Sequence, residues 1–269
     1  MAAPRSALTA RFSWRFALAA VLCGTAGLGC GGGEDGLSYA ASAELAYRNA
    51  LDEFYDEDCL VAEPAFRNVR RKFPYSRFAA LAELRAADCL FEDAKFPEAI
   101  QGYRQFARYR PSHVELAYAH FRIALSHYEQ IPSEWWLTPP SHERDQHYTQ
   151  EAMRLLRRFL LDHPGDPQVP RAQRLAEDAV RMLAAHELYV ADFYLSRERP
   201  MAAIGRLRTL VQSYPGSEFE TEALHMLGET YLSVNDPARA RKAFKQLVDR
   251  FPQSSEAGEA RDQLASLGG

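Results

Sequence analysis

The hydrophobic and polar positions of the chain follow a register that repeats five times, and each copy ends on a proline. An alanine stands twelve residues before each proline, and large apolar or aromatic residues stand eight and five residues before it. These three positions share one face of an α-helix, where the small residue lets a neighbouring helix approach closely. The pattern therefore predicts five helices that bury one face and end just before Pro74, Pro111, Pro164, Pro215 and Pro252.

A second register follows three of these prolines, with small residues eight and thirteen positions later. These positions belong to the first helix of the next unit, so each unit reads as helix, turn, helix. We therefore expect an all-α, right-handed superhelix of about five helix-turn-helix units, similar to the tetratricopeptide repeat. The last unit carries the small, aromatic and proline positions of that repeat at Gly228, Tyr231, Ala240, Phe244 and Pro252.

The spacing of the prolines is uneven, at 37, 53, 51 and 37 residues. The first long interval contains a loop at 131–147, in which three prolines forbid a continuous helix and two tryptophans, Trp135 and Trp136, stand together. The second contains one extended helix at about 170–197, because no proline interrupts it. We expect this helix to project beyond the solenoid, and the segments 38–130 and 148–267 to hold the N-terminal and C-terminal repeats.

Residues 1–29 have the composition of a secretory signal peptide. Three arginines and no acidic residue precede an apolar or small run at 16–29. That run is shorter than the roughly 20 residues needed to cross a bilayer. The sequence therefore predicts export followed by cleavage.

Cys30 stands where lipoprotein signals end on a cysteine that becomes an acylated N-terminus. We expect lipidation there, with 30–37 as a glycine-rich tether. The alternative is ordinary cleavage near Gly29, which leaves a free periplasmic protein. Gly31, rather than Asp, follows the cysteine, and by resemblance to enterobacterial sorting this favours a lipid anchor in the outer membrane, on its periplasmic face.

The charge balance argues against a nucleic-acid partner. The whole chain has a net charge of −4, and removal of residues 1–29 lowers the basic count from 32 to 29 against 36 acids, a net charge of about −7. The sequence contains no glycine-rich phosphate loop, no G-x-S-x-G and no H-E-x-x-H motif. We therefore expect a protein that is not an enzyme and has no cofactor.

Two segments resemble the BamD family, lipoproteins of the β-barrel assembly machinery in Gram-negative outer membranes. In the loop, Glu143, Arg144 and Asp145 stand where the family has an Asp-Arg-Asp-like run. The stretch 183–207 is the more specific match, and its positions that fit the family pattern are Glu187, Leu188, Val190, Ala191, Tyr194 and Arg197. The lipoprotein-like start and the five repeats agree with this family.

The resemblance implies an adaptor that binds the barrel-forming outer-membrane assembly subunit, other assembly lipoproteins and unfolded outer-membrane proteins. Its N-terminal repeats would form a groove for the aromatic, carboxylate-ended strand of a substrate. Candidate groove residues are Tyr47, Arg48, Arg85, Tyr118 and Arg122, and candidate partner-binding residues are Trp135, Trp136, Glu187, Tyr194 and Arg197. The alternative is a generic periplasmic repeat scaffold that coordinates cell-envelope, Tol or peptidoglycan machinery.

Two groups of side chains have a simpler structural interpretation. Cys59 and Cys89 lie fifteen residues on either side of Pro74, so they are either a disulfide or two small buried thiols, and the distance between helix axes favours thiols. The histidines at 113, 120 and 127 share one helix face but are seven residues apart, too far along the helix to converge on zinc. We expect no metal site.

Overall fold

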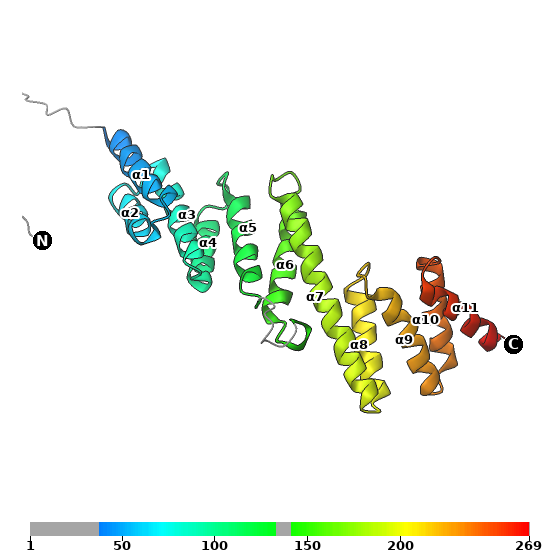
Figure 1. The fold of residues 1–269 in the computed structure, drawn as a ribbon. Helices are drawn as coiled ribbons and strands as arrows, with labels where there is room; N and C mark the ends of the chain where they lie inside the picture. Colours follow the sequence, from blue (N-terminus) through cyan, green and yellow to red (C-terminus); the bar gives the residue numbers. More distant parts are fainter. Residues whose placement is uncertain (1–37, 133–140, 269) are drawn as a thin grey trace, which may run out of the picture. The chain divides into compact units, whose positions relative to one another are not determined.

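The computed structural model describes residues 38–132 and 141–268, and these residues form eleven α-helices and one short 3-10 turn. The elements are α1 (Tyr39–Tyr55), α2 (Cys59–Lys72), α3 (Arg77–Glu92), α4 (Phe96–Tyr109), α5 (Leu116–Tyr128), η1 (Ser141–Glu143), α6 (His147–Asp162), α7 (Val169–Ser196), α8 (Pro200–Ser213), α9 (Glu220–Ser233), α10 (Pro237–Arg250) and α11 (Ser255–Gly268). Each helix packs against the next along the chain (Figure 1). Five pairs and a final helix result, which confirms the predicted all-α repeat.

Several predicted features fall outside the described residues. They are the signal peptide at 1–29, Cys30 with the tether at 30–37, and the tryptophans Trp135 and Trp136. None of the helices in the described ranges combines the length and the apolar character that a membrane span requires.

The fifteen positions of the first register are buried. In α2, α4, α6, α8 and α10 all of them are at most 1% exposed: Ala62, Phe66, Val69, Ala99, Tyr103, Phe106, Ala152, Leu156, Phe159, Ala203, Leu207, Leu210, Ala240, Phe244 and Leu247. Each of these helices ends two residues before its proline, as Lys72 does before Pro74. Phe73, between them, has φ −126° and ψ 54°, because a following proline disfavours the helical region.

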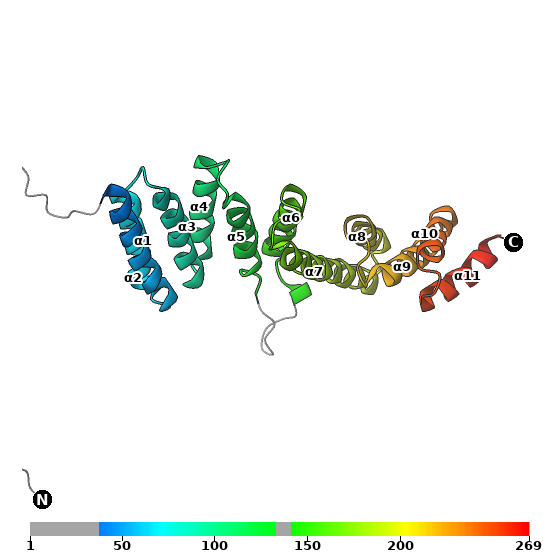
Figure 2. The ribbon, with the colours of Figure 1, turned by 90° about the horizontal axis from the view of Figure 1, so that it is seen from above.

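The helix α7 is 28 residues long and is shared by two units. Ala172 and Ala176, in its first half, pack in the cluster that contains residues of α5 and α6. Ala184 and Leu188, in its second half, pack in the cluster of α8 to α11. The 3-10 turn η1 also packs on α7, where the backbone oxygen of His142 lies 2.6 Å from Nδ1 of His186. The expectation of a projecting helix is therefore wrong. The first half of α7 packs against α6 and its second half against α8, so none of its extra turns stands free (Figures 1 and 2).

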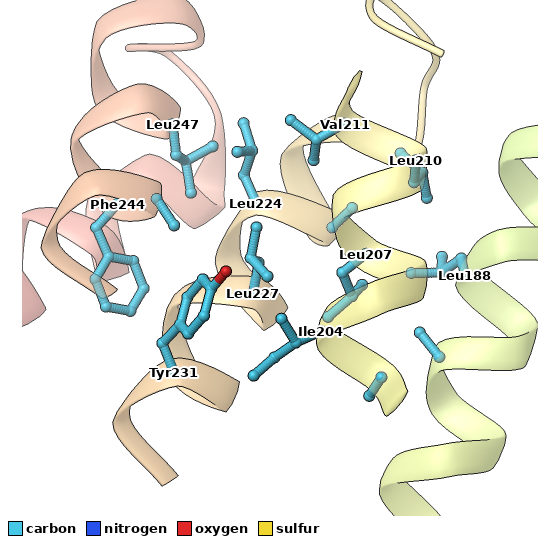
Figure 3. Packing of buried hydrophobic residues seen from close by; sticks show 14 of the residues in the cluster. Leu188, Ile204, Leu207, Leu210, Val211, Leu224, Leu227, Tyr231, Phe244 and Leu247 are labelled. Atoms are coloured by element: carbon cyan, nitrogen blue, oxygen red, sulfur yellow. The ribbon is translucent and has the colours of Figure 1, made fainter. Parts of the chain in front are cut away.

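The C-terminal repeats share one continuous apolar core, shown in part in Figure 3. Ile204 and Val211 of α8 point toward Leu227 and Leu224 of α9, whereas Leu210 lies on the side of α8 that faces α7. The α10 side chains Phe244 and Leu247 close the other side. Gly228 is required at the α9–α10 crossing, because a Cβ there would lie 2.3 Å from the ring of Phe244. The N-terminal helices α1 to α6, with the first half of α7, instead form three smaller apolar clusters.

Candidate functional site

The helices α3, α4 and α5 follow one another in the N-terminal repeats (Figure 1). A polar network of side chains joins these three helices. At its centre is the buried carboxylate of Asp88. Its Oδ1 atom accepts hydrogen bonds from the hydroxyls of Tyr103, at 2.6 Å, and Tyr118, at 2.9 Å. Its Oδ2 atom accepts one from Arg85, at 2.5 Å, and the Nε atom of Arg122 lies 3.4 Å from Oδ1. We call these five side chains the Asp88 network.

Arg122 connects the network to the surface. Its Nε donates to the hydroxyl of Tyr103 at 3.0 Å, and its Nη2 to Glu92 at 3.2 Å. The guanidinium carbon lies 3.8 Å from the centre of the Phe91 ring, a cation–π contact. Glu92 is on the outside, with its side chain 54% exposed, whereas Arg122 is largely covered. On its solvent-facing side, the Arg122 guanidinium is therefore held, among the described residues, only by the solvent-exposed carboxylate of Glu92.

The tyrosines of the network remain hydrogen-bond donors at neutral pH. Burial, reinforced by the charge of Asp88, raises the pKa of Tyr118 to about 12. The same two causes raise the pKa of Tyr103 further. Both hydroxyls stay protonated and donate hydrogen bonds to Asp88. The Asp88 carboxylate therefore needs only some of the N–H groups of Arg85 and Arg122 to complete its hydrogen bonds. Each arginine keeps donor positions for another anion.

This arrangement can bind a carboxylate beside an aromatic group. A planar guanidinium with spare N–H groups matches a carboxylate in a two-pronged geometry. An incoming carboxylate would replace Glu92 on Arg122, and the ring of Phe91 and the ring of Tyr118, 5.4 Å from the Arg85 guanidinium carbon, supply aromatic surface. The network therefore has the chemistry of a peptide C-terminus site.

Four of the five predicted groove residues contribute to this place. Arg85, Tyr118 and Arg122 are members of the network. Burial raises the pKa of Tyr47 and the nearby charge of Arg85 opposes this rise, so Tyr47 lies beside the network. Arg48 does not contribute, because its exposed side chain pairs with Glu44 of the same helix, at 2.6 Å. Sequence reasoning missed Asp88 and Tyr103. A signal was present, because a tyrosine at a buried position of the register requires a polar partner.

The predicted partner-binding residues on α7 lie in different environments. Glu187 is buried and pairs with Arg206 of α8 at 3.4 Å, so it holds two helices together. Tyr194 is partly buried against the C-terminal core. Arg197 is exposed, and its guanidinium lies 5.2 Å from the centre of the Phe193 ring, which is also exposed. The accessible part of this end of α7 is therefore Phe193 with Arg197.

The two cysteines of the repeats, Cys59 and Cys89, are buried free thiols. Burial, the largest cause, raises the pKa of both Cys59 and Cys89, so both stay protonated.

The three histidines do not converge on one another. His120 contacts His163 of the next unit, with 2.9 Å between ring nitrogens, and His127 has no hydrogen-bond partner. Across residues 38–132 and 141–268, no three His, Cys, Asp or Glu side chains are grouped as metal ligands.

The fold defines a helical-repeat protein, and a buried polar network lies in its first units. The family model described as outer membrane lipoprotein, YfiO, matches residues 39–243, and the chain belongs to this family. It is 28% identical over 239 residues to the outer membrane protein assembly factor BamD of Caulobacter vibrioides, covering 87% of this chain and 75% of that one. It is 24% identical over 235 residues to the protein of the same name from Rickettsia prowazekii, covering 84% and 87%.

Among solved structures, a TPR repeats protein from Bacteroides fragilis is similar, at 15% identity and a TM-score of 0.47, covering 84% of this chain and 98% of that one. The family assignment favours outer-membrane assembly over the generic periplasmic scaffold.

Proposed function

We propose that this protein is a non-enzymatic lipoprotein of the outer-membrane protein assembly machinery that recruits unfolded outer-membrane proteins. The observation that carries the proposal is the Asp88 network, in which two arginines with spare donors are held rigidly beside aromatic rings. The family and the names of its relatives support the assembly role. The scaffold supplies a rigid frame for the site, which lowers the entropy lost on binding.

The substrate in this proposal is the C-terminal strand of an unfolded outer-membrane protein. Its terminal carboxylate binds Arg122 in place of Glu92, and its last aromatic side chain packs on Phe91 or Tyr118. Glu92 then acts as an internal competitor that keeps Arg122 oriented while the site is empty. Asp88 and the hydroxyl of Tyr118 fix the second arginine, Arg85, and Tyr47 lies beside it.

The remaining roles belong to parts of the chain away from this network. Cys30 carries the lipid anchor on the periplasmic face of the outer membrane. The exposed end of α7, at Phe193 and Arg197, together with Trp135 and Trp136 of the loop, binds the barrel-forming assembly subunit and other assembly lipoproteins. An exposed aromatic ring under a guanidinium is the composition typical of interface hot spots, which supports this assignment.

The substrate site is tested with a labelled synthetic peptide of alternating apolar residues that ends in phenylalanine with a free carboxylate. Fluorescence anisotropy should show saturable binding, and amidation of the peptide C-terminus should weaken it. Arg122→Gln should weaken binding about 10- to 100-fold, the range of one charge-assisted hydrogen bond or two. The matched control is Arg48→Gln, since Arg48 is exposed and outside the network.

Equal affinity for the free and amidated peptides would contradict carboxylate recognition. Equal losses in Arg122→Gln and Arg48→Gln would show that only overall charge matters. Circular dichroism of each variant separates loss of binding from loss of the fold.

The partner role is tested by affinity purification of the tagged, full-length protein from detergent-solubilised membranes, followed by mass spectrometry. Recovery of the barrel-forming assembly subunit, reduced by Arg197→Ala, supports the proposal. Recovery of Tol or peptidoglycan proteins in its place would overturn it.

A further inference from the structure

Two turns of the N-terminal repeats expose large side chains within strongly basic segments. Tyr75, in the α2–α3 turn, is 94% exposed, and Tyr109, at the end of α4, is 66% exposed. Residues 64–82 contain five arginines and lysines and no acid, and residues 99–114 contain three arginines and no acid. We call the surface formed by these turns the basic edge, represented by Arg71, Lys72, Tyr75, Arg77, Arg108 and Tyr109.

The two turns form one surface, because Glu83 of α3 connects them. Its carboxylate pairs with Arg110, which follows α4, at 2.5 Å and with Arg70 of α2 at 3.9 Å. Figure 2 shows the α2–α3 and α4–α5 connections on the same side of the N-terminal helices. The remaining basic side chains of the basic edge do not pair with any carboxylate in the described part of the chain. Within the described residues, no salt bridge involves Arg71, Lys72, Arg77 or Arg108.

The opposite edge of the same helices has the opposite charge. The segment 52–58, around the α1–α2 turn, contains five acids and no basic residue, and Glu92 and Asp93 stand at the α3–α4 turn. Exposed apolar groups occur there too, at Tyr55 and Leu60, so exposure alone does not distinguish the edges. The sign of the charge does. The N-terminal repeats are polarised from one edge to the other.

The basic edge is also where the described chain begins. The Tyr39 ring, in the first turn of α1, lies 5.4 Å from that of Phe73, and its hydroxyl accepts a hydrogen bond from the Tyr75 backbone. Seven residues lie between Cys30 and Ser38, and the eight Cα–Cα steps reach at most about 28 Å. The acidic edge lies a further ~25 Å away, the rise of the 17-residue α1. A lipid on Cys30 therefore brings the basic edge within about 28 Å of the bilayer, and the attraction of its arginines and lysines to lipid phosphates selects this edge over the acidic one.

We propose that the basic edge lies against an anionic phospholipid surface. Tyr75 and Tyr109 enter the headgroup region, where amphipathic aromatic rings are favoured, and Arg71, Lys72 and Arg77 lie next to lipid phosphates. The orientation rests on the proposed lipid anchor at Cys30, whereas the affinity of the edge for anionic lipid does not. Together they would fix which face of the N-terminal repeats turns toward the periplasm.

The test uses the mature chain, from residue 30 onward, with Cys30→Ser so that it carries no acyl chain. Co-flotation is measured with vesicles of phosphatidylethanolamine and phosphatidylglycerol and with neutral phosphatidylcholine vesicles. We expect binding to the anionic vesicles that falls steeply with added salt, because exposed charges are screened within a Debye length of about 10 Å at 0.1 M. Equal binding to both vesicles, or none to the anionic ones, overturns the proposal.

The triple variant Arg71→Gln, Lys72→Gln, Arg77→Gln should lower the partition coefficient on the order of 100-fold. The control, Arg208→Gln, Lys242→Gln, Lys245→Gln, removes the same number of exposed charges from the C-terminal repeats. Tyr75→Ser should weaken binding more than Tyr55→Ser, which lies on the acidic edge. Equal losses in target and control variants would show that only net charge attracts the protein.

The two proposals fail separately. Mass spectrometry of the membrane-derived protein reports whether Cys30 is acylated, independently of vesicle binding. Loss of the anchor with intact vesicle binding would refute the lipoprotein assignment and leave the basic edge in place.

Discussion

The N-terminal repeats, α1 to α6, and the C-terminal repeats, α7 to α11, use the same register to build different interiors. In the C-terminal repeats one apolar cluster runs from the second half of α7 to α11. In the N-terminal repeats the apolar clusters are separate, and the Asp88 network lies where α3, α4 and α5 meet. Buried carboxylates also occur in the C-terminal repeats, where Glu187 pairs with Arg206, but there each pairs with a single arginine. Because buried ionic groups rarely add net stability compared with apolar packing, the convergence of two arginines and two tyrosines on Asp88 indicates a site rather than a stronger core.

The same position of the register shows how the difference arises. At eight residues before the proline, α8 has Leu207 and α10 has Phe244, both fully buried, whereas α4 has Tyr103. The hydroxyl of Tyr103 requires a partner, and Asp88 and Arg122 provide it. The Tyr103 hydroxyl, which the leucine and phenylalanine lack, is thus accompanied by two charged side chains in the interior, Asp88 and Arg122. The C-terminal repeats do not bear that cost at this position.

The largest effect on stability is expected from Asp88→Asn. Removal of one charge from the buried network leaves the guanidiniums of Arg85 and Arg122 without their carboxylate, which should lower the free energy of unfolding by about 3–5 kcal/mol. Urea denaturation measures it. Glu92→Gln, at a solvated carboxylate of the same helix, should cost less than about 1 kcal/mol. Similar costs for both variants would contradict the idea that the N-terminal interior depends on the network.

A smaller effect is expected from Gly228→Ala in the C-terminal core. The added methyl group would lie 2.3 to 2.7 Å from three ring atoms of Phe244, so α9 and α10 must separate, at about 1–3 kcal/mol. Gly205→Ala on α8 is the control, because nothing lies within 4 Å of its Cβ position. That substitution should raise stability by up to ~1 kcal/mol, as alanine favours the helix. Thermal unfolding of both variants compares them, and a neutral Gly228→Ala would show a looser core.

A still smaller effect is expected from acid on the N-terminal repeats. Burial, the largest cause, lowers the pKa of His120, which faces His163, Asp162 and Arg158, and also that of His127, which faces Glu151, Arg104, His147 and Arg154. A histidine whose folded pKa is depressed binds more protons when unfolded, so its contribution to stability is present above the unfolded pKa and is lost as the pH falls.

The thermal unfolding midpoint should therefore be lower at pH 5.5 than at pH 7.5. In the double variant His120→Gln, His127→Gln, the midpoint should fall less over the same range. Thermal melts across this range measure the slope. An equal slope in wild type and double variant would place the titrating groups elsewhere.

No effect is expected from reduction. Since Cys59 and Cys89 are buried, protonated thiols, treatment with a reductant should leave the unfolding midpoint unchanged. A disulfide between them would instead stabilise the repeats by roughly 3–4 kcal/mol, lost on reduction. Mass spectrometry of the denatured, alkylated but unreduced protein counts the thiols directly, and a protein lighter by two hydrogens with no alkylation at these positions would establish the disulfide.

The parts of the fold that could be predicted from sequence are those that the chain repeats. Ala62, Phe66 and Val69 are visible as core because four other units place similar residues at the same distances from a proline. Arg85 and Arg122 were predicted as groove residues from their helices, and they meet in one place. Their connection through Asp88 could not be predicted, because it depends on how three consecutive helices cross.

The shared helix α7 was foreseen in length but not in environment. Its length follows from an uninterrupted helical pattern, whereas the neighbours that cover it depend on where α8 and the 3-10 turn return along the chain. The same limitation applies to Glu187, whose pairing with Arg206 requires the α7–α8 crossing to be known. The sequence pattern predicts which face of each helix is buried. Which residues remain accessible to a partner depends on how the helices pack.

The 28 residues of α7 also have a mechanical consequence. A continuous helix of that length rises about 42 Å and contains no loop at which the chain can bend. Because one end is embedded in the unit of α6 and the other in the unit of α8, a load applied to the C-terminal repeats is transmitted as tilt or torque to the N-terminal ones. Elasticity, rather than a hinge, then governs how an event at one end of the protein is felt at the other.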